Sequence, residues 1–197
     1  MNNSLGLKIQ KRTPREYILF ASVIIVGIVL DQLTKWCAVK FLRAVPGASV
    51  TVIPGIINFT YKENLGAAFG SFADNRWVFM LSSSVMIIGL SLYLFLGLCT
   101  SRLSQVSVAM IISGGLGNMI DRVGLGFAPK KFAVVDFLEF DFVEFAIFNV
   151  ADSIVCIAAA LLFIAMFREM IAEERTKKLK ENTDADKEGS SDSGRGE

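Results

Sequence analysis

With 197 residues, the chain carries 53% hydrophobic side chains, including 16 Phe, and a mean hydropathy of +0.52. This is far more apolar surface than a soluble domain of this size needs, which indicates a membrane protein. The net charge of +1 favours no polyanionic partner such as a nucleic acid. The sequence contains no His, which excludes Ser-His-Asp and Cys-His triads and an imidazole base, so carboxylates become the leading acid/base candidates.

Four apolar stretches each approach the roughly 20 residues needed to cross about 30 Å of hydrocarbon. They predict transmembrane helices, because a backbone in lipid must satisfy its hydrogen bonds internally. The predicted spans are Tyr17–Val39, Trp77–Leu98, Gln105–Arg122 and Phe145–Phe167. The first follows basic residues, as a secretory signal does, but it lacks a convincing cleavage site, so we interpret it as a retained span. Residues 17–167 are thus predicted to form one membrane domain.

The distribution of Lys and Arg predicts the topology. Basic residues gather in the N-terminal tail (1–16), in the turn at Arg102, and in the tail after the fourth span. By the positive-inside rule, both termini lie in the cytoplasm and the connections 40–76 and 123–144 face outward. The polar C-terminal tail (168–197) predicts a helix that frays near Lys180, followed by disorder.

The outer connections contain short runs typical of strands. Ser49–Ile53 and Ile56–Tyr61 are rich in Val, Ile, Thr and Phe, and Pro54 with Gly55 separates them, which suits a hairpin. Ala133–Phe140 is a third candidate strand. The predicted fold class is therefore a membrane all-α protein with four transmembrane helices and a small extracytoplasmic antiparallel β-sheet between spans 1 and 2.

Three of the predicted spans carry an acid at one depth. Counting from the cytoplasmic end of each span, Asp31, Asp121 and Asp152 follow after about 15 or 16 residues, which places them roughly 22 to 24 Å above the inner boundary. A charge in hydrocarbon costs about 2.5 to 3.5 kcal/mol on insertion scales, so such residues normally face the bundle interior. Small and polar neighbours at helical spacing, such as Gly117 and Asn149, favour close approach of the third and fourth spans.

Two carboxylates that meet in a low-dielectric site cannot both ionise easily, so the pair tends to share a proton. Peptide hydrolysis through water needs such a pair. The ionised member takes a proton from water, and the protonated member supports the oxyanion that develops at the scissile carbonyl. Which Asp begins protonated stays open.

Five motifs occur in an order that resembles the lipoprotein signal peptidase family, also called signal peptidase II. The similarity extends over roughly residues 15–167. The motifs are Asp31-Gln32-Leu33-Thr34-Lys35, Asn64-Leu65-Gly66-Ala67-Ala68-Phe69, Gly114-Gly115-Leu116-Gly117-Asn118-Met119-Ile120-Asp121-Arg122, Val134-Val135-Asp136-Phe137 and Phe148-Asn149-Val150-Ala151-Asp152-Ser153.

The resemblance implies a four-helix peptidase of the bacterial inner membrane that acts near the outer face. It would cleave diacylglyceryl-modified prolipoproteins before the lipidated Cys, with Asp121 and Asp152 as the catalytic dyad, no metal or other cofactor, and inhibition by globomycin-like cyclic peptides. We expect a monomer in contact with membrane lipid. Positions that would support the site or contact substrate are Asp31, Lys35, Asn64, Gly66, Asn118, Arg122, Asp136, Asn149 and Ala151.

Several of these residues have plainer interpretations. Asp31 and Lys35 at i and i+4 suit an ordinary ion pair, and we favour structural support over substrate contact. Arg122 alone would mark the membrane interface, Asp136 would be a loop acid, and the Asn64-Leu65-Gly66 segment would be a turn. The glycines before Asn118 favour a face for close helix packing over a phosphate-binding loop.

Other functions compete with a peptidase. A proton-coupled transporter also uses intramembrane acids, but the acids here cluster at one side and the chain shows no repeated halves. A membrane scaffold has no need of paired inward acids, and a magnesium-dependent hydrolase would be sensitive to chelators. Cys37, Cys99 and Cys156 lack CxxC spacing, so we expect free, buried thiols.

Overall fold

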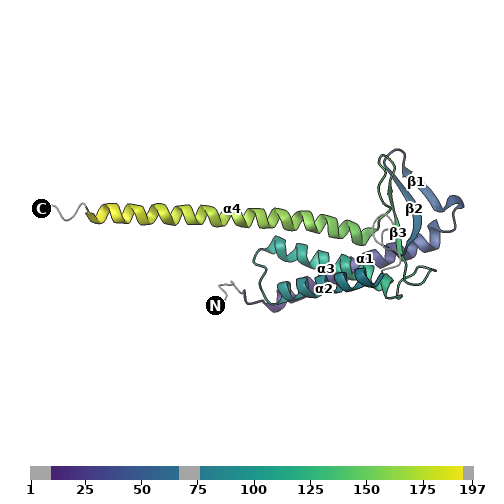
Figure 1. The fold of residues 1–197 in the computed structure, drawn as a ribbon, viewed down its shortest axis with the longest axis horizontal. Coiled ribbons are helices and arrows are strands. Elements are labelled where there is room, and N and C mark those ends of the chain that lie inside the picture. Colours follow the sequence, from purple (N-terminus) through teal and green to yellow (C-terminus); the bar gives the residue numbers. More distant parts are fainter. Residues whose placement is uncertain (1–9, 67–75, 193–197) are drawn as a thin grey trace.

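The computed structural model of the chain describes residues 10–66 and 76–192 and shows a helical bundle with a small sheet at one end (Figure 1). The helices are α1 (Pro14–Cys37), α2 (Arg76–Phe95), α3 (Arg102–Arg122) and α4 (Val150–Asp192). The strands are β1 (Ser49–Ile53), β2 (Ile57–Asn64) and β3 (Val134–Phe140). Two short helical turns, Ala38–Leu42 and Pro46–Ala48, connect α1 to β1.

The first helix begins at a strong start signal. The Thr13 side chain accepts the backbone N–H of Glu16, the Glu16 carboxylate accepts the backbone N–H of Thr13, and Pro14 occupies the first helical position. This reciprocal arrangement satisfies N–H groups that the first helical turn leaves without partners. Beyond Cys37 the helix widens into a π-helical turn, which carries the chain toward the sheet.

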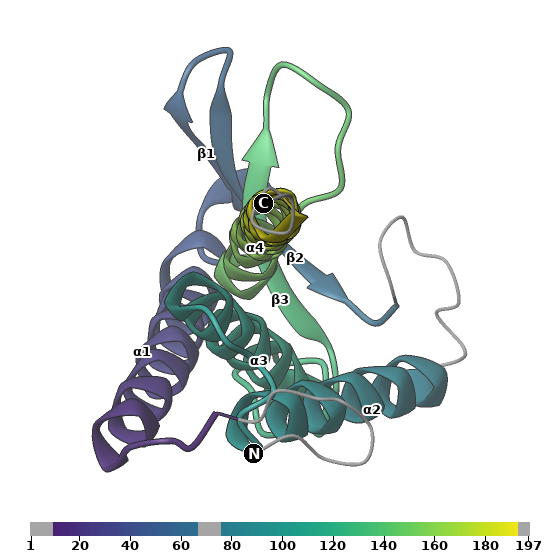
Figure 2. The same cartoon turned by 90° about the vertical axis from the view of Figure 1, so that its left-hand side faces the viewer.

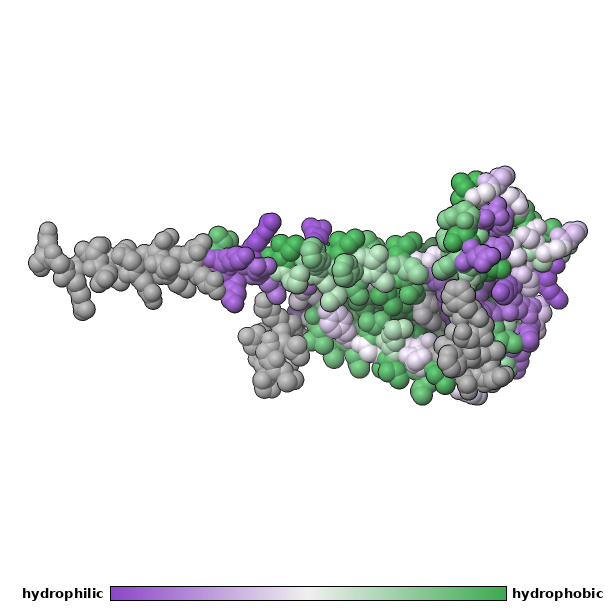
Figure 3. Space-filling view, turned by 45° about the horizontal axis from the view of Figure 1, so that its top comes forward, coloured by the Kyte–Doolittle hydropathy of each residue, from purple (hydrophilic) through white to green (hydrophobic). Residues whose placement is uncertain are grey.

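Helix α3 lies at the centre of the bundle and packs against the other three helices (Figure 2). Within the described residues, the segments Pro14–Leu42, Arg102–Arg122 and Val150–Leu179 are long and apolar enough to cross a membrane, and Met80–Phe95 is a shorter apolar helix. The outward faces of the bundle are covered by apolar side chains, as Figure 3 shows. A bundle that buries charged side chains such as Asp31 and Lys35 and exposes apolar ones suits lipid as its solvent.

The three strands form one antiparallel sheet in the order β1-β2-β3. In the β1–β2 pair Ser49 lies opposite Thr60, and in the β2–β3 pair Lys62 lies opposite Asp136. Gly55 turns the hairpin with a φ of 74°, in the left-handed region that glycine adopts without steric cost. The three predicted strands are confirmed, and the sheet lies beside the N-terminal end of α4 (Figure 1).

The fourth helix differs from the prediction at both ends. It begins at Val150 instead of Phe145, because Phe148 still pairs with Leu138 of β3 and Asn149 caps the helix. It does not fray near Lys180 but continues to Asp192, so α4 projects well beyond the other helices in Figure 1. Polar composition therefore did not end the helix, although residues 181–192 include Asn, Thr, Asp, Gly and Ser, whose intrinsic helix propensity is low.

The cysteines are free, but only Cys99 is buried, whereas Cys37 is half-buried and Cys156 is exposed on α4. The expectation of buried thiols is therefore wrong for Cys156, because α4 turns that face outward. Parts of the predicted tails and of the first outer connection lie outside the described residues. They are residues 1–9, 67–75 and 193–197, and they include Ala67, Ala68 and Phe69 of the second motif.

Candidate active site

The Lys35 ammonium lies at the centre of a buried cluster between α1 and α3. Its Nζ is 2.8 Å from Oδ2 of Asp31, 2.7 Å from Oδ2 of Asp121 and 2.9 Å from Oδ1 of Asn118. Lys35 and Asp31 are completely buried, and Asp121 is 1% exposed. Lys35 thus donates hydrogen bonds to Asp31 and Asn118 and forms an ion pair with Asp121, so its ammonium is bound to the site from three sides.

Asp31 also connects the cluster to α4. Its Oδ1 accepts the backbone N–H of Ala151 at 3.0 Å, one of the free N–H groups in the first turn of that helix. A carboxylate at a helix N-terminus is stabilised by the N–H groups and the helix dipole. One side chain of α1 thereby fixes the position of both Lys35 and the start of α4.

Asp152 lies in the first turn of α4 and shares a capping box with Asn149. Its Oδ2 accepts the backbone N–H of Asn149 at 3.1 Å, and Oδ1 of Asn149 accepts the backbone N–H of Asp152 at 3.0 Å. The other carboxylate oxygen, Oδ1, accepts the amide of Asn118 at 2.8 Å. Asp152 is half-buried, so it is the more accessible of the two predicted catalytic acids.

Asn118 joins the two acids. It lies one turn before Asp121 on the same face of α3, and its Oδ1 accepts from Lys35 while its Nδ2 donates to Asp152. The carboxylates of Asp121 and Asp152 are thus connected through one ammonium and one amide. Two acids held in this way on neighbouring helices have the components of general acid/base catalysis, in which one member is ionised and the other carries a proton.

A second group of predicted residues belongs to the sheet and its border with α4. Asp136 of β3 is 2% exposed, and its two oxygens accept the side-chain amides of Asn149 at 2.7 Å and Asn64 at 2.9 Å. Oδ1 of Asn64 accepts the backbone N–H of Gly66 at 3.0 Å. Burial raises the pKa of Asp136 to about 6, while the two amides oppose the shift.

Arg122 completes the set at the end of α3. Its Nη1 is 3.5 Å from the carbonyl oxygen of Asn118, and its guanidinium interacts electrostatically with Asp152, Asp136 and Asp121. The structure therefore brings the predicted site residues to one end of the bundle. Gly66 and Ala151 take part through their backbone N–H groups.

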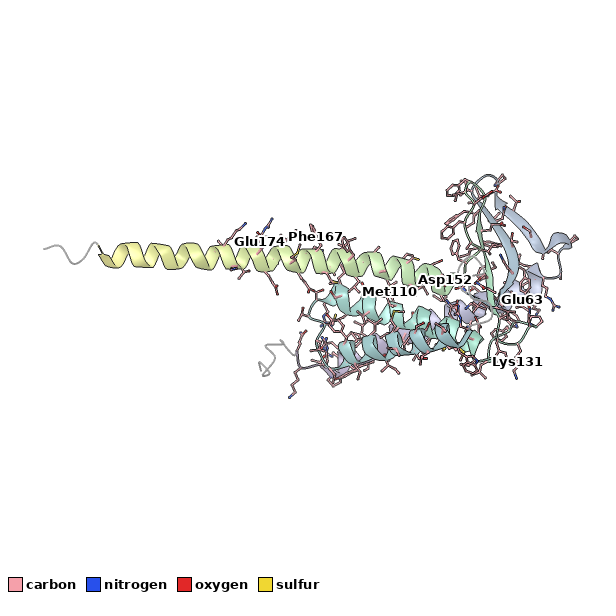
Figure 4. All side chains as sticks on the ribbon, viewed as in Figure 1. Glu63, Met110, Lys131, Asp152, Phe167 and Glu174 are labelled. Atoms are coloured by element: carbon pink, nitrogen blue, oxygen red, sulfur yellow. The ribbon has the colours of Figure 1, made fainter. Side chains whose placement is uncertain are left out.

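Two cavities adjoin this region. One of about 920 Å³ lies between the end of β2, β3 and the segment 141–147, and its described lining includes Asn64, Gly66 and Asp136. A smaller one of about 280 Å³ reaches Asp121 beside the loop that follows α3. Figure 4 shows Asp152 where α4 meets the sheet, with Glu63 on the sheet and Lys131 in the loop beyond α3.

Sequence reasoning missed two contacts of Asp121. The Gln32 amide donates to the carbonyl oxygen of Gly117 at 3.0 Å and lies 3.2 Å from Asp31 and 3.4 Å from Asp121. Gln32 lies inside the first motif, and this position is the feature of the sequence that could have identified it as a site residue. The backbone of Gly126 packs so closely on the Asp121 carboxylate that any Cβ there would collide with it, and no local pattern marks this glycine.

Comparison with known proteins finds similar sequences that cover most of the chain. The family described as Signal peptidase (SPase) II matches residues 23–168. A lipoprotein signal peptidase of Streptococcus pyogenes serotype M1 is 38% identical over 152 residues, which cover 77% of this chain and 94% of that protein. One of Clostridium tetani (strain Massachusetts / E88) is 37% identical over 156 residues, covering 78% and 95%.

Two solved structures are also similar. Both are described as a bacterial membrane enzyme determined by the in meso method. The one at 2.3 Å resolution has a TM-score of 0.67 at 28% identity and covers 77% of this chain and 89% of its own. The one at 1.9 Å resolution has a TM-score of 0.64 at 30% identity and covers 75% and 92%.

Proposed function

The chain belongs to the signal peptidase II family, and from this we propose that it removes the signal peptide from diacylglyceryl-modified prolipoproteins, cleaving before the lipidated Cys by water activated between Asp121 and Asp152. Membership in the family supports a multi-pass bacterial membrane peptidase that processes lipoproteins. The observation that carries the mechanism is the pair of acids on two packed helices, joined through Lys35 and Asn118.

In the proposed reaction, the ionised Asp removes a proton from water and the resulting hydroxide attacks the scissile carbonyl carbon. The protonated Asp hydrogen-bonds to the oxyanion as it forms. The proton taken from water then passes from the pair to the leaving nitrogen as the C–N bond breaks, which leaves the two acids with a single proton, as at the start. The step needs no metal or other cofactor.

We place the site near the outer face of a four-span membrane protein whose termini lie in the cytoplasm. The positive-inside distribution of Lys and Arg supports this orientation. The sheet and the first turn of α4 lie at the same end of the bundle, opposite the long projection of α4 (Figure 1). This end is the one that a lipid-anchored substrate outside the cell membrane would reach.

Conservative replacement of each acid tests the proposal. Asp121→Asn and Asp152→Asn keep the size of the side chain but remove its acid/base function, and each is expected to lower kcat by at least about 100-fold. The assay uses purified protein with a diacylglyceryl-modified precursor peptide, and thermal unfolding verifies that each variant folds. Glu173→Gln, an exposed acid of α4, is the matched control. Full activity in either folded variant would remove that residue from the mechanism.

Chelation separates this mechanism from metal-assisted hydrolysis. EDTA is expected to leave cleavage of the lipidated precursor unchanged, and strong inhibition that added Mg²⁺ reverses would refute the metal-free reaction. We also expect the enzyme to act as a monomer in the lipid bilayer and to be inhibited by globomycin-like cyclic peptides.

A further inference from the structure

A cavity of about 350 Å³ lies between α1, α3 and α4, within the segments that are long and apolar enough to cross a membrane. Helices α1 and α4 both pack on α3 and contact each other much less (Figure 2). The described lining of the cavity contains no charged side chain. It includes Val23, Val26 and Leu30 of α1, Met110 and Ser113 of α3, and Ile154 of α4.

The cavity opens outward from a close contact at Gly27. A Cβ at this glycine would lie 2.3 Å from Oγ of Ser113 and 3.7 Å from Cδ1 of Ile154, so the three helices meet here. Gly27 is buried, whereas the side chain of Val26 beside it is 56% exposed. The cavity is therefore a groove in the outer surface of the bundle, and we call it the α1–α4 groove.

The lining of the α1–α4 groove favours hydrocarbon over water. Oγ of Ser113 donates to the carbonyl oxygen of Met110 at 2.8 Å, so this buried hydroxyl already has a partner within α3. Water occupies a cavity only where two or more polar groups can bind it, and an unfilled space deprives the lining of van der Waals contacts. An apolar group that enters from the bilayer supplies those contacts.

The size of the groove favours a single chain over a helix. From Val23 to Leu30 it extends about 10 Å along α1. A transmembrane helix is about 10 to 12 Å wide with its side chains, so the same length of helix needs roughly 800 Å³, more than the groove provides. A flexible acyl chain is narrow enough to lie in it.

Hydrocarbon chains come from two sources, the bilayer and a lipidated substrate. Ile154 lines the groove, and Asp152, the more accessible of the proposed catalytic acids, precedes it by two residues. Two residues correspond to about 200° around an α-helix, so the groove and Asp152 lie on nearly opposite sides of α4. The groove is instead continuous with the exposed apolar face of α1 through Val26 and Leu30. The bilayer is the source that this position favours.

We infer that an acyl chain of a membrane phospholipid occupies the α1–α4 groove and joins α1 to α4 as a structural part of the bundle. The groove ends at Leu30, and the next residue, Asp31, accepts the backbone N–H of Ala151 on α4. The chain thus fills the space beside this contact and stabilises the arrangement of helices that the contact requires. The inference is independent of the reaction proposed for Asp121 and Asp152.

Photolabelling of the full chain tests the inference. The protein is reconstituted in vesicles of phosphatidylethanolamine and phosphatidylglycerol that contain a trace of phospholipid with a diazirine in one acyl chain. Met110, which is half-buried, is expected to be labelled. Val26→Phe places a larger side chain in the groove and should lower the labelling of Met110 at least about threefold, because it displaces the acyl chain.

Val29→Phe is the matched control, because Val29 is 55% exposed on the same helix but does not line the groove. It should leave the labelling of Met110 unchanged. Equal labelling in the wild type and in Val26→Phe would overturn the inference, as would absence of label from Met110 in the wild type. Val26→Leu, a smaller addition, provides the same comparison if the Phe variant does not fold.

A competition experiment distinguishes the two sources of hydrocarbon. An excess of diacylglyceryl-modified precursor peptide should leave the labelling of Met110 unchanged, because the precursor binds on the other side of α4. A precursor that abolishes the label would assign the groove to the substrate and overturn the inference.

Thermal unfolding measures the contribution of the chain to stability. Addition of phospholipid to the detergent-solubilised wild type should raise the thermal midpoint by roughly 5 °C, and Val29→Phe should respond equally. Val26→Phe should respond less than half as much, because its own side chain fills the groove. An equal rise in all three proteins would show that phospholipid does not stabilise the bundle through this groove.

Discussion

Among single side chains, Lys35 has the most demanding environment, because its ammonium is fully buried and contacts two carboxylates. The spacing of Asp31 and Lys35 in sequence predicted their ion pair, and the third motif indicated Asn118 and Asp121 as site residues. Contact between Lys35 and Asp121 was not predictable, since it depends on how α1 and α3 cross. Local spacing gives neighbours on one helix, whereas contacts between helices follow from packing.

Replacing Lys35 by Met should therefore lower stability as well as activity. The change leaves two buried carboxylates without their cation, and we expect the free energy of unfolding to fall by about 3 to 5 kcal/mol. Unfolding by denaturant in detergent micelles measures the difference. Lys40→Met, which replaces an exposed lysine in the π-helical turn after α1, is the control. Equal small losses in both variants would contradict a central role for the Lys35 ion pairs.

Asp136 should make stability depend on pH. Its pKa is raised to about 6 by burial, with Asp152 of α4 adding to the rise and Lys35 of α1 opposing it, and Arg122 of α3 also faces it. The folded state thus binds a proton more tightly than the unfolded state, so the ionisation of Asp136 removes stability as pH rises from about 4 to about 6.

The comparison of wild type with Asp136→Asn isolates this effect, because other groups titrate in both proteins. Between pH 4 and 7 the stability of the wild type should decline relative to the variant by up to about 3 kcal/mol. Thermal unfolding at several pH values gives the difference. A constant difference across this range would show that Asp136 does not take up a proton on folding.

At the scale of elements, the sequence predicted the three strands well, because β-branched runs bounded by Pro and Gly are local signals. The start of α4 was placed too early, since the apolar residues before Asn149 read as membrane span. In the structure Phe148 pairs with Leu138 of β3, and the helix begins at a capping box after it. Apolar composition does not distinguish a buried strand partner from the first turn of a helix.

The glycines of α3 allow the helices to approach closely, and two of them give contrasting predictions. A Cβ at Gly117 would lie 2.6 Å from Oδ2 of Asp31, which is held by Lys35 and Ala151, whereas one at Gly115 meets only the side-chain end of Ile87 at 3.1 Å. Gly117→Ala should therefore cost about 1 to 3 kcal/mol and most of the activity.

Gly115→Ala should stay within about 1 kcal/mol of the wild type, because a methyl on the helix improves propensity and Ile87 can move. Cleavage assays and thermal unfolding of the two variants make the comparison. Similar behaviour of both would argue against a specific close contact between α1 and α3 at Gly117.

At the scale of the whole molecule, counting residues along each predicted span placed Asp31, Asp121 and Asp152 at one depth, and the structure brings them to one end of the bundle. The contacts at the opposite end of the bundle were not predicted. Arg12, expected in a solvated tail, is buried there, and its guanidinium donates to the carbonyl oxygen of Cys99 and pairs with Glu16 at 3.7 Å. Local sequence does not distinguish a basic residue in a solvated tail from one that forms a buried contact.

The contacts of Arg12 join the N-terminal segment to the turn between α2 and α3, so Arg12→Ala should loosen the bundle at the end opposite to Asp121 and Asp152. We expect the thermal midpoint to fall by roughly 5 to 10 °C. At temperatures where the variant stays folded, kcat should equal the wild-type value. Arg15→Ala, an exposed neighbour, is the control. A kcat that falls while the midpoint is unchanged would contradict a purely structural role.

The charges of the site also bear on what can enter it. Among the residues that the structure describes, four carboxylates, Asp31, Asp121, Asp136 and Asp152, gather around two cations, Lys35 and Arg122. The net negative charge of these groups should repel anions, so we expect an anionic group on a ligand to bind less well beside them. By the same reasoning, hydroxyl or amine groups suit a tight-binding inhibitor, and a carboxylate in their place should weaken it.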